Sequence, residues 1–235
     1  LAEWAARAKA PSASLTLLLH QNLLAYAPAV NQTTRQEWRK IEGRFEQIRF
    51  VEDSRELYRL IGHVMARRQG KKPSAASDLA SVAEGVVASG WLGGIDDEAD
   101  VADLLERARP LSAAALHVLP RLVARVGQNE RSLFAFLESL DPAAPVGMDE
   151  VFTAFSDAMR ANVGVGGVHR RWLEAQNARA RAEDAVEREA IAAACLLQLG
   201  AQGERRTLPR ATLELAVRAR GIDAETARAA IDSLI

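Results

Sequence analysis

The sequence predicts a mainly α-helical fold that begins with the last part of an α/β domain. Ala, Leu and Arg dominate the 235 residues, and these residue types favour helix over sheet. Only two short runs resemble strands, at residues 14–20 and 47–50, and both lie near the N-terminus. Two strands cannot form a stable sheet alone, so they need partner strands from upstream. We therefore expect the chain to be a fragment of a longer protein.

The first predicted strand ends in a polar group. The run SLTLLLH (14–20) is apolar and is bounded by turn signals, which is typical of a buried strand. His20, Gln21 and Asn22 follow where the strand ends. Ligands of α/β sheets bind at the carboxyl ends of the strands, so these three side chains are candidates for a site.

An arginine separates a predicted helix from the second strand. The helix ends at Gly43, a residue that favours helix C-termini. Arg44 follows directly, and the strand at 47–50 comes next. A further helix is predicted over 54–68, because its apolar residues share one face. Arg44 is thus either an ordinary surface arginine or an arginine presented to something outside the domain.

Nearly everything after residue 66 is predicted to be helical. We expect the basic stretch ARRQGKKPS (66–74) to be a linker whose cations are solvated. The alternative is that these cations contact nucleic acid. The charged residues of this stretch are Arg67, Arg68, Lys71 and Lys72. The helices expected after it span 75–89, 99–107, 112–126, 129–140, 148–161, 169–199 (as one helix or two), 208–219 and 224–235.

Three domains are expected from these elements: an α/β remnant at 1–66, an all-helical block at 67–146, and a helical, winged-helix-like block at 147–235. The last two helices have the order of a helix-turn-helix, which would place the second helix in the DNA major groove. However, the second helix is not basic, and the carboxylates of Asp223, Glu225 and Asp232 would be repelled by DNA phosphates. An intramolecular or protein–protein role is therefore favoured over reading of DNA.

Composition excludes several classes of protein. The formal net charge is -1, with 30 basic and 31 acidic residues, so bulk charge does not indicate nucleic acid. The single cysteine, Cys195, lies in an apolar helical run and is expected to be a buried, inert thiol. It cannot form a disulfide within the chain, which fits a reducing, cytoplasmic location. No apolar run reaches membrane-spanning length, and the first residues, which are mixed in charge, are not expected to be a secretory signal.

No complete catalytic constellation appears in the sequence. A phosphate-binding loop of the form G-x-x-x-x-G-K-[ST] is missing. The four histidines do not have zinc-type spacing with Cys195. The acidic stretch at 96–100 reads as the solvated start of a helix and not as a magnesium site.

Three segments nevertheless resemble, in order, the C-terminal half of an AAA+ ATPase module. SLTLLLHQN (14–22) looks like the strand that ends in the sensor-1 residue. GRFEQIRF (43–50), followed by EDSRELYRLI (52–61), looks like the arginine-finger segment and the helix that leaves the core. LVARVGQNERSLFAFLESL (122–140) looks like the lid helix that bears the sensor-2 arginine. The amino-acid sequence of these segments also resembles that of large bacterial ATP-binding proteins, many of them encoded among phage-defence genes.

The resemblance implies a function for each candidate residue. Arg44 would be an arginine finger that acts on the nucleotide of a neighbouring subunit, which implies a homo-oligomer or partner subunits. One of His20, Gln21 and Asn22 would orient the attacking water. Arg131, with Asn129 beside it, would contact the phosphates from the lid. ATP and Mg²⁺ would be bound mainly by residues outside this chain, and the chain alone should not hydrolyse ATP.

Each of these residues also has a simpler interpretation. Arg44 can be a surface or salt-bridge arginine, and Arg131 can be a solvated residue at a helix start. His20 can be a structural histidine at a strand end. The alternative function is therefore a helical regulatory or protein-interaction module with a helix-turn-helix-like end and no ATP chemistry.

Overall fold

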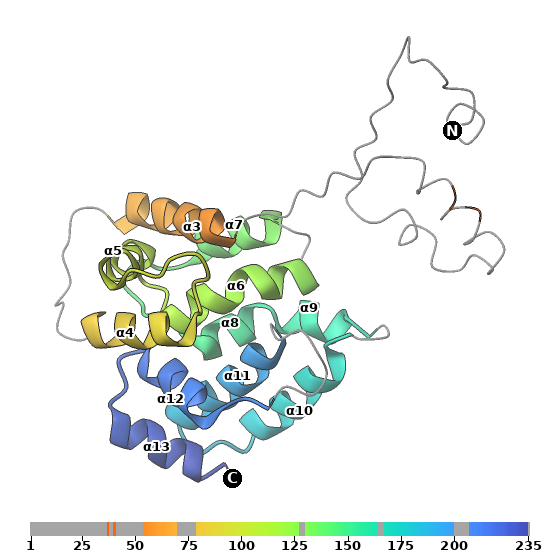
Figure 1. The fold of residues 1–235 in the computed structure, drawn as a ribbon. Coiled ribbons are helices and arrows are strands. Elements are labelled where there is room, and N and C mark those ends of the chain that lie inside the picture. The colour runs from red at the N-terminus through yellow and green to blue at the C-terminus, as the bar shows by residue number, and fades with distance from the viewer. Residues whose placement is uncertain are drawn as a thin grey trace. The chain divides into compact units, whose positions relative to one another are not determined.

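The computed structural model describes residues 54–69, 79–126, 130–163, 167–199 and 207–234, together with the single positions 37 and 40. The five ranges belong to one compact unit, Glu52–Ile235, whose ribbon is drawn in Figure 1. Its described helices are α3 (Ser54–Gln69), α4 (Leu79–Ser89), α5 (Glu98–Ala108), α6 (Ala113–Val126), α7 (Glu130–Ser139), α8 (Met148–Ala154), α9 (Ser156–Ala161), α10 (His169–Arg179), α11 (Ala185–Leu199), α12 (Arg210–Arg218) and α13 (Ala224–Asp232).

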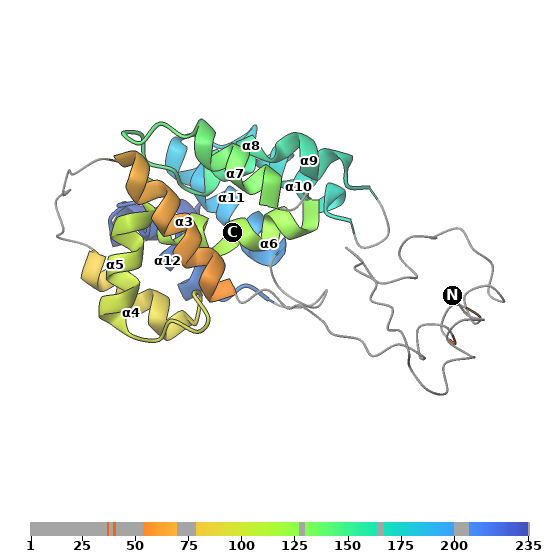
Figure 2. The ribbon, with the colours of Figure 1, turned by 90° about the horizontal axis from the view of Figure 1, so that it is seen from above.

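Helix α6 lies at the centre of this unit. It packs against α3 and α7 on one side and against α8, α11 and α12 on the other, as Figures 1 and 2 show from two directions. Apolar residues cover most of the surface of α6, and its polar residues His117, Arg121 and Arg125 share one face. Leu116 and Leu119 have no exposed surface at all. One continuous core therefore joins helices from both halves of the described chain.

The chain ends with a smaller, separate core. Helices α11, α12 and α13 pack pairwise, and they bury Ala190, Val217, Ala227 and Ile231 between them. Asp223 caps the start of α13, because its carboxylate accepts hydrogen bonds from the backbone N–H groups of the first turn. The C-terminal helix pair is thus attached to the main core through α11 and α12.

The mainly helical prediction is confirmed for the described residues. The acidic stretch at 96–100 is the start of α5, as expected, and Asp97 caps it by accepting from Ala99 N at 2.9 Å and Asp100 N at 3.0 Å. The predicted strands at 14–20 and 47–50 lie outside the described residues. The described part of the chain contains one isolated parallel bridge, between Leu111 and Val146.

One predicted helix differs in detail. The helix expected over 148–161 is divided into α8 and α9 at Phe155, whose backbone leaves the helical region at φ -98° and ψ 7°. The Phe155 ring is buried and lies 5.3 Å from the ring of Phe136 in α7, so the turn directs an aromatic side chain into the core. The stretch 169–199, which was expected to form one helix or two, forms two, α10 and α11.

The predicted domain boundaries remain predictions. The boundary at 66–67 falls within the last turns of α3, and the one at 146–147 falls in the loop before α8. None of the described helices combines the length and the apolar character that a membrane span requires.

Candidate functional site

Most of the residues predicted from the sequence to form a site lie outside the described residues. These are His20, Gln21, Asn22, Arg44 and Asn129. Arg131 lies in the first turn of α7, although its side chain is not among those described. The described residues do contain three polar clusters and one groove that sequence reasoning did not identify.

The first cluster joins α3 to α7. Arg68, in the last turn of α3, donates hydrogen bonds to the carbonyl oxygens of Leu137 and Leu140, the latter at 3.1 Å. The last carbonyls of a helix have no partner within it and carry its negative dipole end, so a guanidinium stabilises them. The prediction of a solvated linker cation is therefore wrong for Arg68. Arg67, its neighbour, is exposed as expected.

This contact gives a first prediction, on stability. We expect Arg68→Met to lower the free energy of unfolding by about 2 kcal/mol, because it removes charge-assisted hydrogen bonds to half-buried carbonyls. The matched control is Arg67→Met, which changes an exposed arginine on the same turn and should cost about 0.5 kcal/mol or less. Urea unfolding of the three proteins measures both values, and equal losses would contradict the role of Arg68.

The second cluster surrounds a histidine between α6 and the loop before α5. His117 Nδ1 lies 2.6 Å from the carbonyl oxygen of Trp91, and its ring stacks on the Trp91 ring at 5.2 Å. Arg121 Nη1 lies 2.6 Å from Nε2 of the same ring. A carbonyl only accepts and a guanidinium only donates, so the hydrogen is on Nδ1 and Nε2 accepts. The hydroxyl of Tyr58 lies 3.5 Å from the carbonyl oxygens of Trp91 and His117.

This arrangement keeps His117 neutral. Burial lowers the pKa of His117 to about 3, and the charge of Arg121 acts in the same direction. A second ring proton would also point at the guanidinium of Arg121. His117 is therefore suited to a structural connection and not to acid–base work near neutral pH.

A pH dependence of stability follows. The unfolded state binds a proton at His117 near pH 6.5, whereas the folded state does so only near pH 3. Stability from this residue is therefore complete above pH 6.5 and is lost as pH falls, by about 1.4 kcal/mol per pH unit. We expect His117→Gln to remove about 2 kcal/mol of the difference in unfolding free energy between pH 7 and pH 5. His63→Gln, at an exposed histidine, is the control, and an equally large effect of that variant would contradict the role of His117.

The third cluster is built around Glu189 of α11, whose side chain has no exposed surface. Its carboxylate accepts from the backbone N–H groups of Met148 at 2.7 Å and Asp149 at 3.0 Å, at the start of α8. Arg220 donates to Glu189 at 3.0 Å and also bonds to Glu150. Burial raises the pKa of Glu189, against the lowering effect of these donors. A charge far along the chain therefore caps α8 and connects it to the α12–α13 turn.

Gly147 is required by this contact. A Cβ atom at this position would lie 2.7 Å from Oε2 and 2.8 Å from Cδ of Glu189, closer than real Cβ contacts allow. The Gly147 N–H also donates to Glu150 at 2.8 Å. The glycine thus lets the backbone approach a buried carboxylate.

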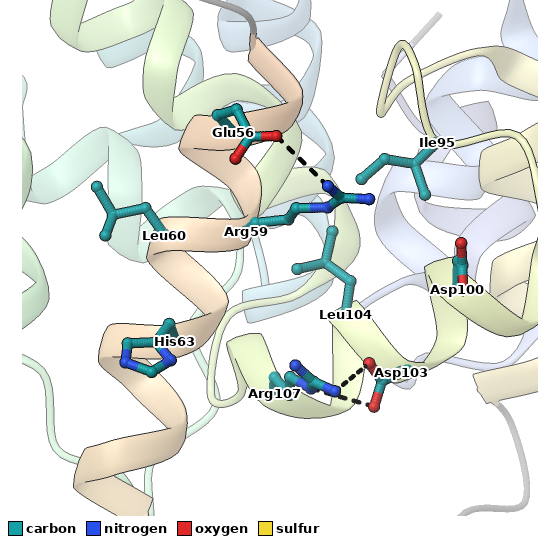
Figure 3. A pocket seen from close by; sticks show the side chains of 9 residues that line it. All are labelled: Glu56, Arg59, Leu60, His63, Ile95, Asp100, Asp103, Leu104 and Arg107. Atoms are coloured by element: carbon teal, nitrogen blue, oxygen red, sulfur yellow. Dashed lines mark hydrogen bonds and ion pairs between the residues drawn. The ribbon is translucent and has the colours of Figure 1, made fainter.

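The groove lies between α3 and α5 and has a volume of about 500 Å³. Leu60, Ile95 and Leu104 form its apolar part, and charged side chains from both helices surround them (Figure 3). Arg59 pairs with Glu56 at 3.4 Å, and Arg107 pairs with Asp103 at 2.7 Å. The remaining lining residues are His63 and Asp100.

The described part of the chain gives little support to a thiol nucleophile or to a metal site. Cys195 is buried, as predicted, and burial raises the pKa of its thiol to about 12, so it is a poor nucleophile. No group of three His, Cys, Asp or Glu side chains there is placed to hold a metal ion.

Comparisons of this chain with protein-family models, with curated proteins and with solved structures found no match.

Proposed function

We propose that this chain is the sensor, lid and C-terminal helical part of an AAA+-type ATPase that works as an oligomer. The proposal rests on the order of three sequence segments: the strand ending in His20–Asn22, the Arg44 segment, and the helix beginning at Glu130 and Arg131. It includes an α/β remnant before α3 and a winged-helix-like C-terminal block. A role in bacterial phage defence follows from the same resemblance.

The residue types suit phosphoryl transfer. The reaction spreads negative charge over the γ-phosphoryl oxygens, and its catalysis consists mostly of positioning and electrostatic stabilisation. A guanidinium is always charged and offers a planar fork to phosphate. In the proposal, Arg44 supplies that charge to a neighbouring subunit, and Arg131 contacts the phosphates within its own subunit. In the proposal, ATP and Mg²⁺ are bound mainly by residues outside this chain.

One structural observation supports the proposal, namely the contact between α3 and α7. Helix α3 follows the Arg44 segment in the chain, and Arg131 is in the first turn of α7. Arg68 connects the C-terminal end of α3 to the C-terminal end of α7. Helix α7 has 10 residues and is about 15 Å long, so Arg131 lies at the end opposite the contact. If Arg131 binds the phosphates and the lid moves, the contact between α7 and α3 would therefore move α3 as well.

The test is ATP binding and hydrolysis by the full-length protein. The proposal requires Mg²⁺-dependent hydrolysis that rises with protein concentration more steeply than in proportion, because each active site needs a neighbour's Arg44. A protein that neither binds nor hydrolyses ATP would overturn it. Hydrolysis in strict proportion to concentration, with no oligomer detected, would overturn the role of the neighbour.

The second candidate is a helical interaction module without ATP chemistry, and the α12–α13 pair favours it. Arg210 bonds to Glu214 at 2.9 Å and pairs with Asp232 at 2.6 Å. Arg228 pairs with Glu214 at 3.5 Å. These arginines lower the pKa of Glu214, and Arg210 lowers that of Asp232. Arg210 and Arg228 are thus engaged with acids of the same helix pair, which disfavours phosphate contact by these two side chains. Under this candidate, the full-length protein would show no ATP hydrolysis.

A further inference from the structure

Helix α13 is attached to the rest of the unit by few buried contacts. It packs against α11 and α12, and Figure 1 shows it at the edge of the unit. Its buried side chains are Ala227, Ala230 and Ile231. Only Ile231 among them is large, and the hydrogen bond from Ser233 to Glu187 of α11, at 2.7 Å, is exposed. A segment with few buried apolar contacts opens at a lower free energy than the core, so we expect α13 to open locally.

The turn that leads into α13 carries Arg220, which bonds to two carboxylates at the start of α8. Its Nη1 donates to Glu189 at 3.0 Å, and its Nη2 donates to Glu150. These two carboxylates accept hydrogen bonds from three successive backbone N–H groups, at positions 147–149. One guanidinium is therefore the shared counter-ion of both side chains that hold the start of α8.

The two carboxylates depend on that counter-ion. Glu189 has no exposed surface. Burial raises its pKa, and the charge of Glu150 acts in the same direction. Removal of one partner from a buried ion pair leaves an uncompensated charge, which is strongly destabilising. Withdrawal of Arg220 would thus leave two like charges at the start of α8, one of them buried.

Helices α8 and α13 bury their side chains in different cores. Met148 and Phe152 of α8 are fully buried in the main core, whereas Ile231 of α13 belongs to the small C-terminal core. Helix α11 contacts both helices. The described contacts therefore connect α13 to α8 in two ways, through α11 and through the charged side chains around Arg220.

We propose that Arg220 is a latch between the C-terminal helix pair and α8, so that opening of α13 releases Arg220 and loosens the start of α8. Arg220 lies in the turn directly before α13, so its position is restrained by the docking of that helix. Its partner Glu150 is 70 positions away in the chain. Such coupling is reciprocal, so a change that loosens the start of α8 also loosens α13. Anything that displaces α13 would thereby alter the main core at α8.

The experiment is native-state hydrogen exchange of the whole chain, measured at the start of α8, in α13 and, as an internal reference, in α5. Ile231→Ala removes the one large buried side chain of α13. We expect it to speed exchange by about tenfold in α13 and by a similar factor at the start of α8, because both exchange through the same opening. Exchange in α5 should not change. Ile231→Val should give smaller effects at the same two places, which keeps the test valid if Ile231→Ala does not fold.

Arg220→Met separates the latch from the contacts through α11. It should speed exchange at the start of α8 by about tenfold, and adding Ile231→Ala to it should produce no further increase there. The control is Arg218→Met, at an exposed arginine in the last turn of α12, which should leave exchange in α8 unchanged.

Three results would overturn the latch. In the first, Ile231→Ala and Ile231→Val speed exchange in α13 alone. In the second, all three helices speed up equally, which indicates global opening. In the third, Ile231→Ala keeps its full effect on α8 when Arg220 is replaced, which assigns the coupling to α11. No nucleotide is present in these measurements, so their outcome does not depend on the proposed ATP chemistry.

Discussion

Replacement of Glu189 by alanine is expected to lower the free energy of unfolding by about 3–5 kcal/mol, because it breaks a buried ion pair by removing one partner. The variant leaves the N–H groups of Met148 and Asp149 without their acceptor inside the protein. It also leaves Arg220 with Glu150 as its remaining counter-ion. We expect this to be the largest effect on stability of any single polar side chain among the described residues.

The measurement is urea unfolding followed by circular dichroism, with Glu84→Ala on the exposed face of α4 as the control. Glu84 is an exposed helical glutamate, and its replacement should cost about 0.5 kcal/mol or less. Glu189→Gln should fall between the two, because the amide oxygen still accepts one hydrogen bond while the charge is lost. A loss below about 1 kcal/mol for Glu189→Ala would contradict the capping role.

For the proposed arginine finger, replacement of Arg44 by alanine is expected to reduce ATP hydrolysis by the full-length protein by a factor of about 10³–10⁵, the range known for arginine fingers of GTPases. The reason is that the guanidinium interacts with charge that develops only in the transition state. ATP affinity should therefore change little. Unchanged turnover would exclude a finger role for Arg44.

Arg131→Ala is the informative comparison for this prediction. Because Arg131 is proposed to contact the phosphates in its own subunit, we expect its loss to weaken ATP binding as well as hydrolysis. Arg160→Ala, at an exposed arginine on α9, should change neither. A fluorescent ATP analogue measures affinity, and phosphate release measures turnover. If Arg44→Ala and Arg131→Ala gave the same pattern, the two assigned roles would not be distinct.

The helices could be predicted from the sequence because their signals are local. The sequence shows apolar residues at helical spacing and the capping residues Asp97 and Asp223. It also shows Pro110 and Gly221, which lie between helices. These features depend on neighbours a few residues away. Even the buried state of Cys195 follows from the apolar run around it.

The polar clusters could not be predicted, because they join residues far apart in the sequence. Glu189 and Met148 are separated by 41 positions, and Arg68 and Leu137 by 69. One signal for Glu189 was present: an acidic residue begins the otherwise apolar run EAIAAACLL (189–197). A charge at a core-facing helix position requires a partner, but the sequence does not identify which one.

The break at Phe155 shows the same limit on a smaller scale. Residues 148–161 have a regular helical pattern with no Gly or Pro, so the sequence predicts one helix. The turn at Phe155 is instead associated with packing of its ring against Phe136. Tertiary contacts of this kind override local propensity.

The proposal that Arg44 acts on a neighbour's nucleotide is tested most directly by mixing two inactive full-length proteins. One carries Arg44→Ala, and the other has an intact Arg44 but a substitution of the lysine in the phosphate loop that the proposal expects outside this chain. In a random equimolar mixture, about a quarter of the subunit interfaces combine an intact loop with an intact Arg44, so about a quarter of the wild-type hydrolysis should return. A mixture that remains as inactive as its two components would contradict the account.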